Sequence, residues 1–265
     1  MSITKNQGFV EKIDRKGMTT KGASVYAPVV DRNPINNKEG KVMVTVLVLN
    51  NKGGCGKTTI ATNLASCFAS KGCQTVLFDL DRQRSSVHWL GQRAEWRNKI
   101  TAESAWSQRR FPPGTEWVIM DAPAQIQDIE LQGLLNRIDI MLIPVLPSPI
   151  DIRAAADFIG QLILDGKIQH RDSRIGVIAN RLRERTHVSQ KLLKFLNSLS
   201  IPMVAQLRDT QNYLHAAERG IGVFEMEPAL VRQDLAQWQG LVRWLERRQQ
   251  AEVTRQSIRH SPTPG

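Results

Sequence analysis

The chain has 265 residues, and its 36 Lys and Arg against 25 Asp and Glu give a formal net charge of +11 at pH 7. This length suits one α/β domain with a full core and requires no second domain. The longest apolar runs are too short to cross a bilayer and the chain opens without an apolar signal region, so we expect a cytoplasmic protein. Cys55, Cys67 and Cys73 form no CxxC pair, which argues against a disulfide framework and against a zinc site.

The positive charge is unevenly distributed along the chain. Residues 1–41 hold 8 Lys and Arg against 4 Asp and Glu, residues 42–180 hold 15 against 13, and residues 181–265 hold 13 against 8. The middle of the chain is therefore nearly balanced, and the excess lies at its two ends. One interpretation is a polyanionic partner for those ends, either nucleic acid or an anionic membrane, and the other is a generally basic surface.

Residues 1–41 are polar, contain scattered Gly and Pro, and lack a sustained apolar period. We expect a mostly disordered basic tail there, followed by one domain over residues 42–265. The domain opens with the continuous aliphatic run 42–49, which is typical of a strand buried on both faces. After a Gly-rich segment, apolar residues at helical spacing predict a helix that begins at about Lys57.

The rest of the domain alternates between strand-like and helix-like segments. Strands are predicted over 73–78, 116–120, 139–145, 174–179 and 201–207. Helices are predicted over 85–96, with Ser85 or Ser86 near its cap, and over 150–164, 188–199, 212–219 and 230–248. This alternation predicts the α/β class, a parallel β-sheet flanked by helices on both faces. Ligands of such sheets bind at the carboxyl ends of the strands, so Asn50, residues 79–81 and Asp121 should share one rim.

The Gly-rich segment between the first strand and the first helix has the chemistry of a phosphate loop. Gly53, Gly54 and Gly56 let the backbone turn with its N–H groups pointing inward, and the helix N-terminus adds partial positive charge. Lys57 would bring a point charge to the β- and γ-phosphates of a nucleotide, and the hydroxyl of Thr58 can ligate the bridging Mg²⁺. The segment therefore predicts a nucleoside triphosphate site.

The loop departs from the usual G-x-x-x-x-G-K-[ST] pattern, because Asn51 stands where Gly is required and Lys52 follows it. The form KGGxGKT, together with the TTIATNLA that follows, resembles the deviant Walker A loop of the ParA/MinD family of ATPases. The resemblance implies a P-loop ATPase that binds ATP and Mg²⁺ and forms a homodimer around the nucleotide. It also implies that Lys52 reaches the partner's phosphates and acts in catalysis with Lys57; the alternative for Lys52 is an exposed loop lysine. The residues implied to contact the nucleotide are Gly53, Gly54, Cys55, Gly56, Lys57, Thr58 and Thr59.

Two hydrophobic strands end in aspartate, and a nucleotide site with Mg²⁺ needs carboxylates at this rim. The segment WVIMDAP is a Walker B pattern, in which Asp121 would hold Mg²⁺ together with Thr58. The segment FDLDRQRS resembles the second switch of the family, written DxDPQ, which implies that Asp81 orients the attacking water and Asp79 supports the Mg²⁺ side. Arg82 and Arg84 depart from that pattern. The alternative is that both switch aspartates only end a strand as turn residues.

The resemblance extends over roughly residues 42–227. In the family an asparagine at the end of the strand RIGVIAN contacts the adenine edge, which implies that role for Asn180. The segments IPVLPSPID and AAERGIGVFE also resemble parts of the family pattern. The phrase LNNKGGCGKTTIATNLA resembles the carboxysome-positioning, McdA-like branch.

The family contains members that bind DNA without sequence preference and members that bind membrane through a C-terminal amphipathic helix. Leu235, Trp238, Val242 and Leu245 recur at helical spacing near the C-terminus, and we expect this stripe to pack on the core rather than on a bilayer. Sequence-blind contacts to DNA phosphates are expected from basic residues of the C-terminal third. These are Arg181, Arg185, Lys191, Arg243 and Arg247.

The resemblance thus implies a nucleoid-associated ATPase that dimerises with ATP, binds non-specific DNA and positions a cargo. The cargo would be a plasmid or chromosome locus, or a protein body such as a carboxysome. A ParB-like or McdB-like adaptor protein would stimulate hydrolysis. The alternatives are a MinD-like membrane-associated regulator and a metabolic ATP-dependent enzyme that keeps the dimer.

Overall fold

The structure is a computed structural model that describes residues 42–103, 111–165, 167 and 174–259, with the backbone alone at 12–13, 19–20 and 255–259. At the N-terminal side, β1 (Lys12–Ile13) and β2 (Thr19–Thr20) pair as a short antiparallel ribbon. The other residues of the predicted disordered tail lie outside the described residues, so that expectation stays a prediction.

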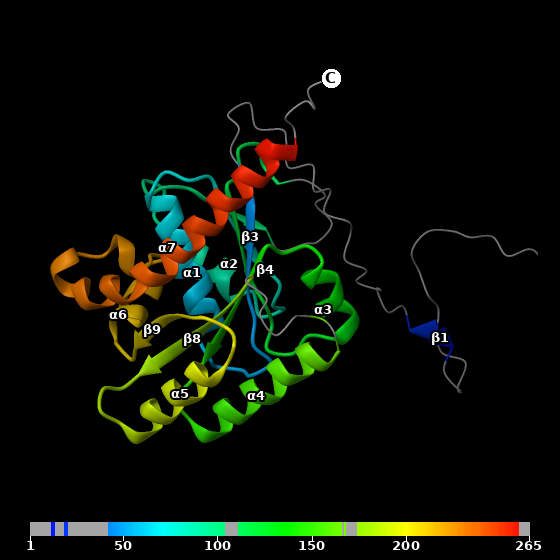
Figure 1. The fold of residues 1–265 in the computed structure, drawn as a ribbon. Helices are drawn as coiled ribbons and strands as arrows, with labels where there is room; N and C mark the ends of the chain where they lie inside the picture. Colours follow the sequence, from blue (N-terminus) through cyan, green and yellow to red (C-terminus); the bar gives the residue numbers. More distant parts are fainter. Residues whose placement is uncertain are drawn as a thin grey trace, which may run out of the picture.

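Seven parallel strands form the central sheet in the order β5-β4-β6-β3-β7-β8-β9 (Figure 1). In chain order they are β3 (Val44–Val48), β4 (Thr75–Asp79), β5 (Ile100–Glu103), β6 (Trp117–Asp121), β7 (Ile140–Val145), β8 (Ile175–Leu182) and β9 (Met203–Arg208). Every residue of β3, β4, β6 and β7 is buried, because helices cover both faces of the sheet. This explains why these strands are continuous apolar runs rather than alternating ones.

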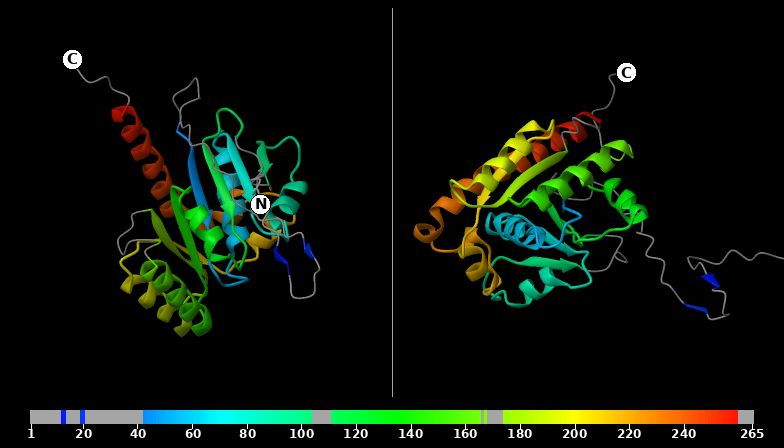
Figure 2. Two further views of the ribbon diagram at one scale, coloured as in Figure 1. Left: turned by 90° about the vertical axis from the view of Figure 1, so that its right-hand side faces the viewer. Right: turned by 90° about the horizontal axis from the view of Figure 1, so that it is seen from below.

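The helices divide between the two faces of the sheet, as the views in Figure 2 show. On one face pack α1 (Lys57–Ser70), α2 (Ser85–Gly91), the 3₁₀ turn η1 (Val223–Glu225) and α7 (Pro228–Arg259). On the other face pack α3 (Asp128–Leu135), α4 (Pro149–Leu164) and α5 (His187–Ser198). The short α6 (Asn212–Ala217) precedes η1. The predicted fold class, a parallel sheet flanked by helices on both faces, is confirmed.

Each predicted strand overlaps an observed one, but β5, α3 and η1 were not predicted. The edge strand β5 has only four residues, one of them exposed, and α3 has eight residues in a segment to which no element was assigned. The helix predicted over 85–96 ends at Gly91, whereas α7 continues to Arg259, well past the predicted end at Arg248. Short elements are held by their neighbours more than by their own periodicity, so their patterns are weak.

The apolar stripe of α7 packs on the core, as predicted. Trp238, Val242 and Leu245 are buried there and Leu235 packs against the same cluster. Near the far end of the helix, the side-chain amide of Gln249 donates to the carbonyl of Val42 at 3.3 Å, at the entrance to β3. The far part of helix α7 therefore lies beside the start of β3.

A buried ion pair joins the segment after α2 to η1. Arg93 donates to both carboxylate oxygens of Glu225 at 2.7 and 2.9 Å, and the two side chains are only 6% and 5% exposed. The same guanidinium also donates to the carbonyls of Gly220 and Asn98. The pair is therefore fully bonded, and its loss would leave a cation buried among carbonyls.

We predict that Glu225→Gln destabilises the protein by about 3 kcal/mol, because it removes one partner of a buried ion pair. The measurement is the free energy of unfolding in urea. Glu246→Gln is the matched control, since Glu246 pairs with Lys71 where both side chains are more than 40% exposed; there we expect a loss of no more than about 1 kcal/mol. Equal losses in the two variants would contradict the prediction.

Candidate nucleotide and cation site

The carboxyl ends of β3, β4 and β6 meet at one rim of the sheet. In the parallel register, Asp121 of β6 stands opposite Val48 of β3 on one side and opposite Asp79 of β4 on the other. The loop that leaves β3 therefore runs directly past both aspartates. The sequence prediction that these strand ends share a rim is confirmed.

The loop from Lys52 to Gly56 depends on glycine at two left-handed positions, Gly54 with φ 76° and Gly56 with φ 94°. A Cβ at Gly56 would also lie 2.3 Å from the side-chain nitrogen of Asn180. A side chain there is therefore excluded by both backbone strain and space. The turn brings the chain straight into α1, whose N-terminal N–H groups face the loop.

Lys57 lies inside the loop rather than extending into solvent. Its ammonium donates to the carbonyls of Asn50 at 3.2 Å and Lys52 at 3.1 Å, and the residue is 7% exposed. The thiol of Cys55 also donates to the Lys52 carbonyl. The charge is thus held at the centre of the loop by weak neutral acceptors, which an anion such as a phosphate can replace.

Asn180 fastens the loop to β8. Its side-chain nitrogen donates to the carbonyl of Cys55 at 2.8 Å, and its side-chain oxygen accepts from the backbone N–H of Arg181. The residue is 4% exposed, so both halves of the amide are bonded within the protein. An adenine contact for Asn180 stays a prediction, and its structural role is to position the phosphate loop.

Asp121 is buried and only half satisfied. Its Oδ2 accepts from the hydroxyl of Ser86 at 2.6 Å, while Oδ1 has no donor within the described part of the chain. Burial raises the pKa of this carboxyl to about 6, although the hydroxyls of Ser86 and Thr58 lower it, and nearby Asp79 raises it further. A buried, unpaired carboxylate oxygen beside a threonine hydroxyl is the donor set that a hydrated Mg²⁺ takes, so these residues fit that cation.

Asp79 serves as the cap of α2. Its Oδ2 accepts from the backbone N–H groups of Ser86 and Val87, and its Oδ1 accepts from that of Asp81. Ser85 and Ser86 are the first two residues of α2, near its cap as predicted, and Arg84 occupies the cap position in the left-handed region without a side-chain cap bond. The carboxylate of Asp79, which lies seven residues before Ser86 in the sequence, provides the cap instead. A supporting role toward Mg²⁺ stays a prediction for an aspartate whose oxygens already accept three N–H groups.

Asp81 and Lys52 are half-exposed at the mouth of the site. Asp81 lies two residues beyond β4, and its carboxylate accepts from the backbone N–H of Gln83 at 3.0 Å. The backbone N–H of Lys52 donates to the side chain of Asn50, which is 1% exposed and also donates to the carbonyl of Pro144. Sequence reasoning placed Asn50 on the rim and Ser86 near a helix cap, but it assigned neither residue a role in the site. No motif marks them, since their roles depend on contacts across the sheet.

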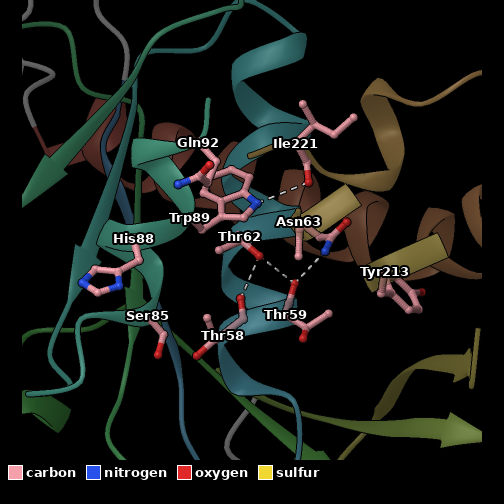
Figure 3. A pocket seen from close by; sticks show the side chains of 11 residues that line it. Thr58, Thr59, Thr62, Asn63, Ser85, His88, Trp89, Gln92, Tyr213 and Ile221 are labelled. Atoms are coloured by element: carbon pink, nitrogen blue, oxygen red, sulfur yellow. Dashed lines mark hydrogen bonds between the residues drawn. The ribbon is translucent and has the colours of Figure 1, made fainter. Parts of the chain in front are cut away.

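Beside the loop, α1, α2 and α6 line an open cavity of about 320 Å³, shown in Figure 3. Thr58 and Thr59 lie at its phosphate-loop end and Ser85 at its switch end, with Trp89 and Tyr213 as aromatic walls. The hydrogen bonds drawn there run within the protein, for example from the Trp89 indole nitrogen to the carbonyl of Ile221. The cavity adjoins the phosphate loop without being part of it.

The sequence profile described as the CobQ/CobB/MinD/ParA nucleotide binding domain matches residues 46–223. The chain belongs to this family. It is thus a P-loop ATPase domain of the ParA/MinD kind, as its phosphate loop predicted.

Two of the similar proteins are carboxysome-distribution proteins. The chain is 27% identical to "Maintenance of carboxysome distribution protein A" of Halothiobacillus neapolitanus over 194 residues, covering 69% of this chain and 87% of that protein. It is 28% identical to the protein of the same name from Gloeobacter kilaueensis over 211 residues, covering 76% and 94%. Among solved structures, Cyanothece McdA in complex with ATP has a TM-score of 0.57 at 17% identity, covering 75% of this chain and 96% of that one. At that identity the structural match concerns the fold.

The predicted DNA-binding residues of this ATPase domain are all exposed, but they form two separate groups. Arg181 lies near the end of β8 and Arg185 in the loop that follows, both in the left-handed region, and Lys191 follows on α5. A hydrogen bond from Gln233 to Glu184 places the start of α7 beside that loop. Arg243 and Arg247 come ten and more residues later on α7, about 15 Å or further along the helix. Contacts to DNA stay a prediction for both groups.

We predict that Asp121→Asn stabilises the nucleotide-free ATPase domain at pH 7.5. The folded pKa of Asp121 lies above its ordinary value of 3.8, so the folded state favours the protonated form, and stability is lost as the pH rises toward about 6. Because a tenfold change in proton affinity is worth about 1.4 kcal/mol, this rise corresponds to roughly 3 kcal/mol.

Urea unfolding without nucleotide or metal at pH 4.5 and pH 7.5 measures this effect. Asp121→Asn should be the more stable protein at pH 7.5, and the difference should be much smaller at pH 4.5, nearer the ordinary pKa of 3.8, because the loss grows as the pH rises from 3.8 toward about 6. A variant that is less stable at pH 7.5 would contradict the assignment of Asp121 as an unsatisfied buried carboxylate.

Proposed function

We propose that this protein is a positioning ATPase that dimerises with ATP and Mg²⁺, binds DNA without sequence preference and moves or partitions a cargo. An adaptor protein of the ParB or McdB kind would stimulate its hydrolysis. The observation that carries the proposal is the preformed phosphate loop, with Lys57 at its centre and Lys52 at its mouth. The relatives named for carboxysome distribution, matched over 87% and 94% of their length, support a protein body as the cargo. A plasmid or chromosome locus is the second kind of cargo.

The residues of the site would have different roles in phosphoryl transfer. Lys57 and the N–H groups of the loop would bind the phosphates, and Thr58 with Asp121 would hold Mg²⁺, which neutralises charge on the phosphates when bound. Asp81, half-exposed at the mouth, would orient the attacking water. Lys52, which is half-exposed on the phosphate loop, would reach the phosphates of the partner protomer. In this arrangement each site is completed only by the dimer.

The membrane-associated alternative requires a helix with an apolar face that is free to contact lipid. No helix of the described part of the chain is both long and apolar enough to span a bilayer. The stripe that would lie on a membrane surface is instead buried, with Trp238 and Leu245 each 0% exposed in the core. The exposed face of α7 carries Arg232, Arg243 and Arg247, which suits a polyanion.

The two lysines of the loop should respond differently to replacement by alanine. Lys57→Ala should abolish nucleotide binding, because its charge lies at the centre of its own loop. Lys52→Ala should bind ATP and remain a monomer, since the proposed contact is with the partner's phosphates. Fluorescent-nucleotide titration and light scattering with ATP measure the two effects. A normal ATP-dependent dimer of Lys52→Ala would rule out the cross-subunit role.

DNA binding should depend on ATP and on salt. Two protomers with three phosphate contacts each would lose affinity on the order of a thousandfold between 50 and 200 mM salt, since each contact adds roughly 0.9 to the log–log slope. Charge reversal of Arg181 with Arg185, or of Arg243 with Arg247, should weaken binding to arbitrary duplexes, measured by fluorescence anisotropy.

Deletion of residues 1–38 is the control for this experiment and should leave DNA binding intact. Binding that is equally tight without ATP, or that disappears only with this deletion, would transfer the DNA site to the N-terminal tail. It would leave the ATPase assignment unchanged.

A further inference from the structure

Ser86 is buried between the two aspartates that end β4 and β6. Its exposed fraction is 0%, its hydroxyl donates to Oδ2 of Asp121 at 2.6 Å, and its backbone N–H donates to Oδ2 of Asp79 at 2.9 Å. It also belongs to the first turn of α2. One residue therefore joins the Walker B carboxylate, the carboxylate that caps α2, and α2 itself.

The hydroxyl of Ser86 determines how the Asp121 carboxylate is presented. With Oδ2 held by Ser86, the unpaired Oδ1 is left for a cation, beside the hydroxyl of Thr58. Hydrogen bonds of this outer kind orient the ligands of metal sites, and their loss typically weakens metal binding by about 10- to 100-fold. Without the hydroxyl, the carboxylate would be free to turn in its pocket.

The first turn of helix α2 is held by the Ser86 hydroxyl bond and by Asp79, which accepts from the N–H groups of Ser86 and Val87. The helix starts from Arg84, which has φ 54° and gives no side-chain cap, only three residues after Asp81. Between α2 and α1 lies the cavity of about 320 Å³ (Figure 3). Three of its polar side chains are bonded internally, with Thr62 and Asn63 donating to carbonyls of α1 and Trp89 to that of Ile221. The cavity thus lies beside α2, and the helix is held in place by the bonds of its first turn and by the bond from Trp89 to Ile221.

We propose that Ser86 is a positioning residue that couples the cation site at Asp121 to helix α2, and through α2 to the segment that carries Asp81. The inference rests on the proposed Mg²⁺ site. When Asp121 binds the cation, the Ser86 bond keeps α2 docked and Asp81 in place. When the cation leaves, the same bond is the point at which α2 is released toward the cavity.

The test is the Mg²⁺ dependence of fluorescent ATP binding. In Ser86→Ala the Mg²⁺ concentration for half-saturation should rise about 10- to 100-fold, while nucleotide binding in EDTA should equal that of the wild type. Ser86→Cys, which keeps the volume but donates poorly, should behave like Ser86→Ala. Ser86→Thr, which keeps the hydroxyl, should recover at least part of the affinity. Ser85→Ala, an exposed neighbour in the same turn, is the matched control and should leave Mg²⁺ binding unchanged.

Hydrogen exchange gives a second readout that does not depend on turnover. Mg²⁺ added with nucleotide should slow exchange over residues 85–91 in the wild type and in Ser85→Ala, but not in Ser86→Ala, while protection of the phosphate loop stays similar in all three. Wild-type Mg²⁺ affinity in Ser86→Ala, or in Ser86→Cys alone, would overturn the proposal. A wild-type protein with no Mg²⁺ dependence would overturn the cation site as well.

Discussion

The parallel register of β3, β4 and β6 is the constraint on which the site depends. It sets Val48, Asp79 and Asp121 at one level, so that the phosphate loop, the switch and the Walker B aspartate all leave the sheet together. Such a register is stable only if both faces of the sheet are covered, and the two hydrophobic clusters supply that cover. A slip by one residue in β6 would move Asp121 off the rim and turn its neighbours to the opposite face.

The site itself contains interactions that do not favour folding. Asp121 has one buried oxygen without a donor in the described part of the chain, and Gly56 and Arg84 both hold left-handed backbone. In a protein selected only for stability, Asp121 would be replaced and Arg84 would have ordinary backbone angles. We propose that these features persist beside the phosphate loop because they serve ligand binding rather than folding.

The sequence was sufficient for the parts of the fold that have long-range periodicity and for the residues that belong to the phosphate loop. A buried strand such as β3 can be predicted from its continuous apolar sequence, because both of its faces must be apolar. The roles of Asn180, Asp79 and Ser86 could not be predicted in the same way. Each depends on a hydrogen bond across the sheet or to a helix end, and no spacing in the chain records which backbone group a side chain will meet. The short elements β5 and α3 were missed because their neighbours, rather than their own sequence, stabilise them.

The contact between Gln249 and Val42 has a topological consequence. It brings the beginning of β3 and the far part of α7 together, although they are separated by almost the whole domain in sequence. Val42 therefore lies beside the part of α7 that holds Gln249, and α7 continues for about 15 Å beyond this contact. A linker that spans this distance could join the two ends of the domain. A circular permutant opened at an exposed loop would then keep every strand of the sheet in its register.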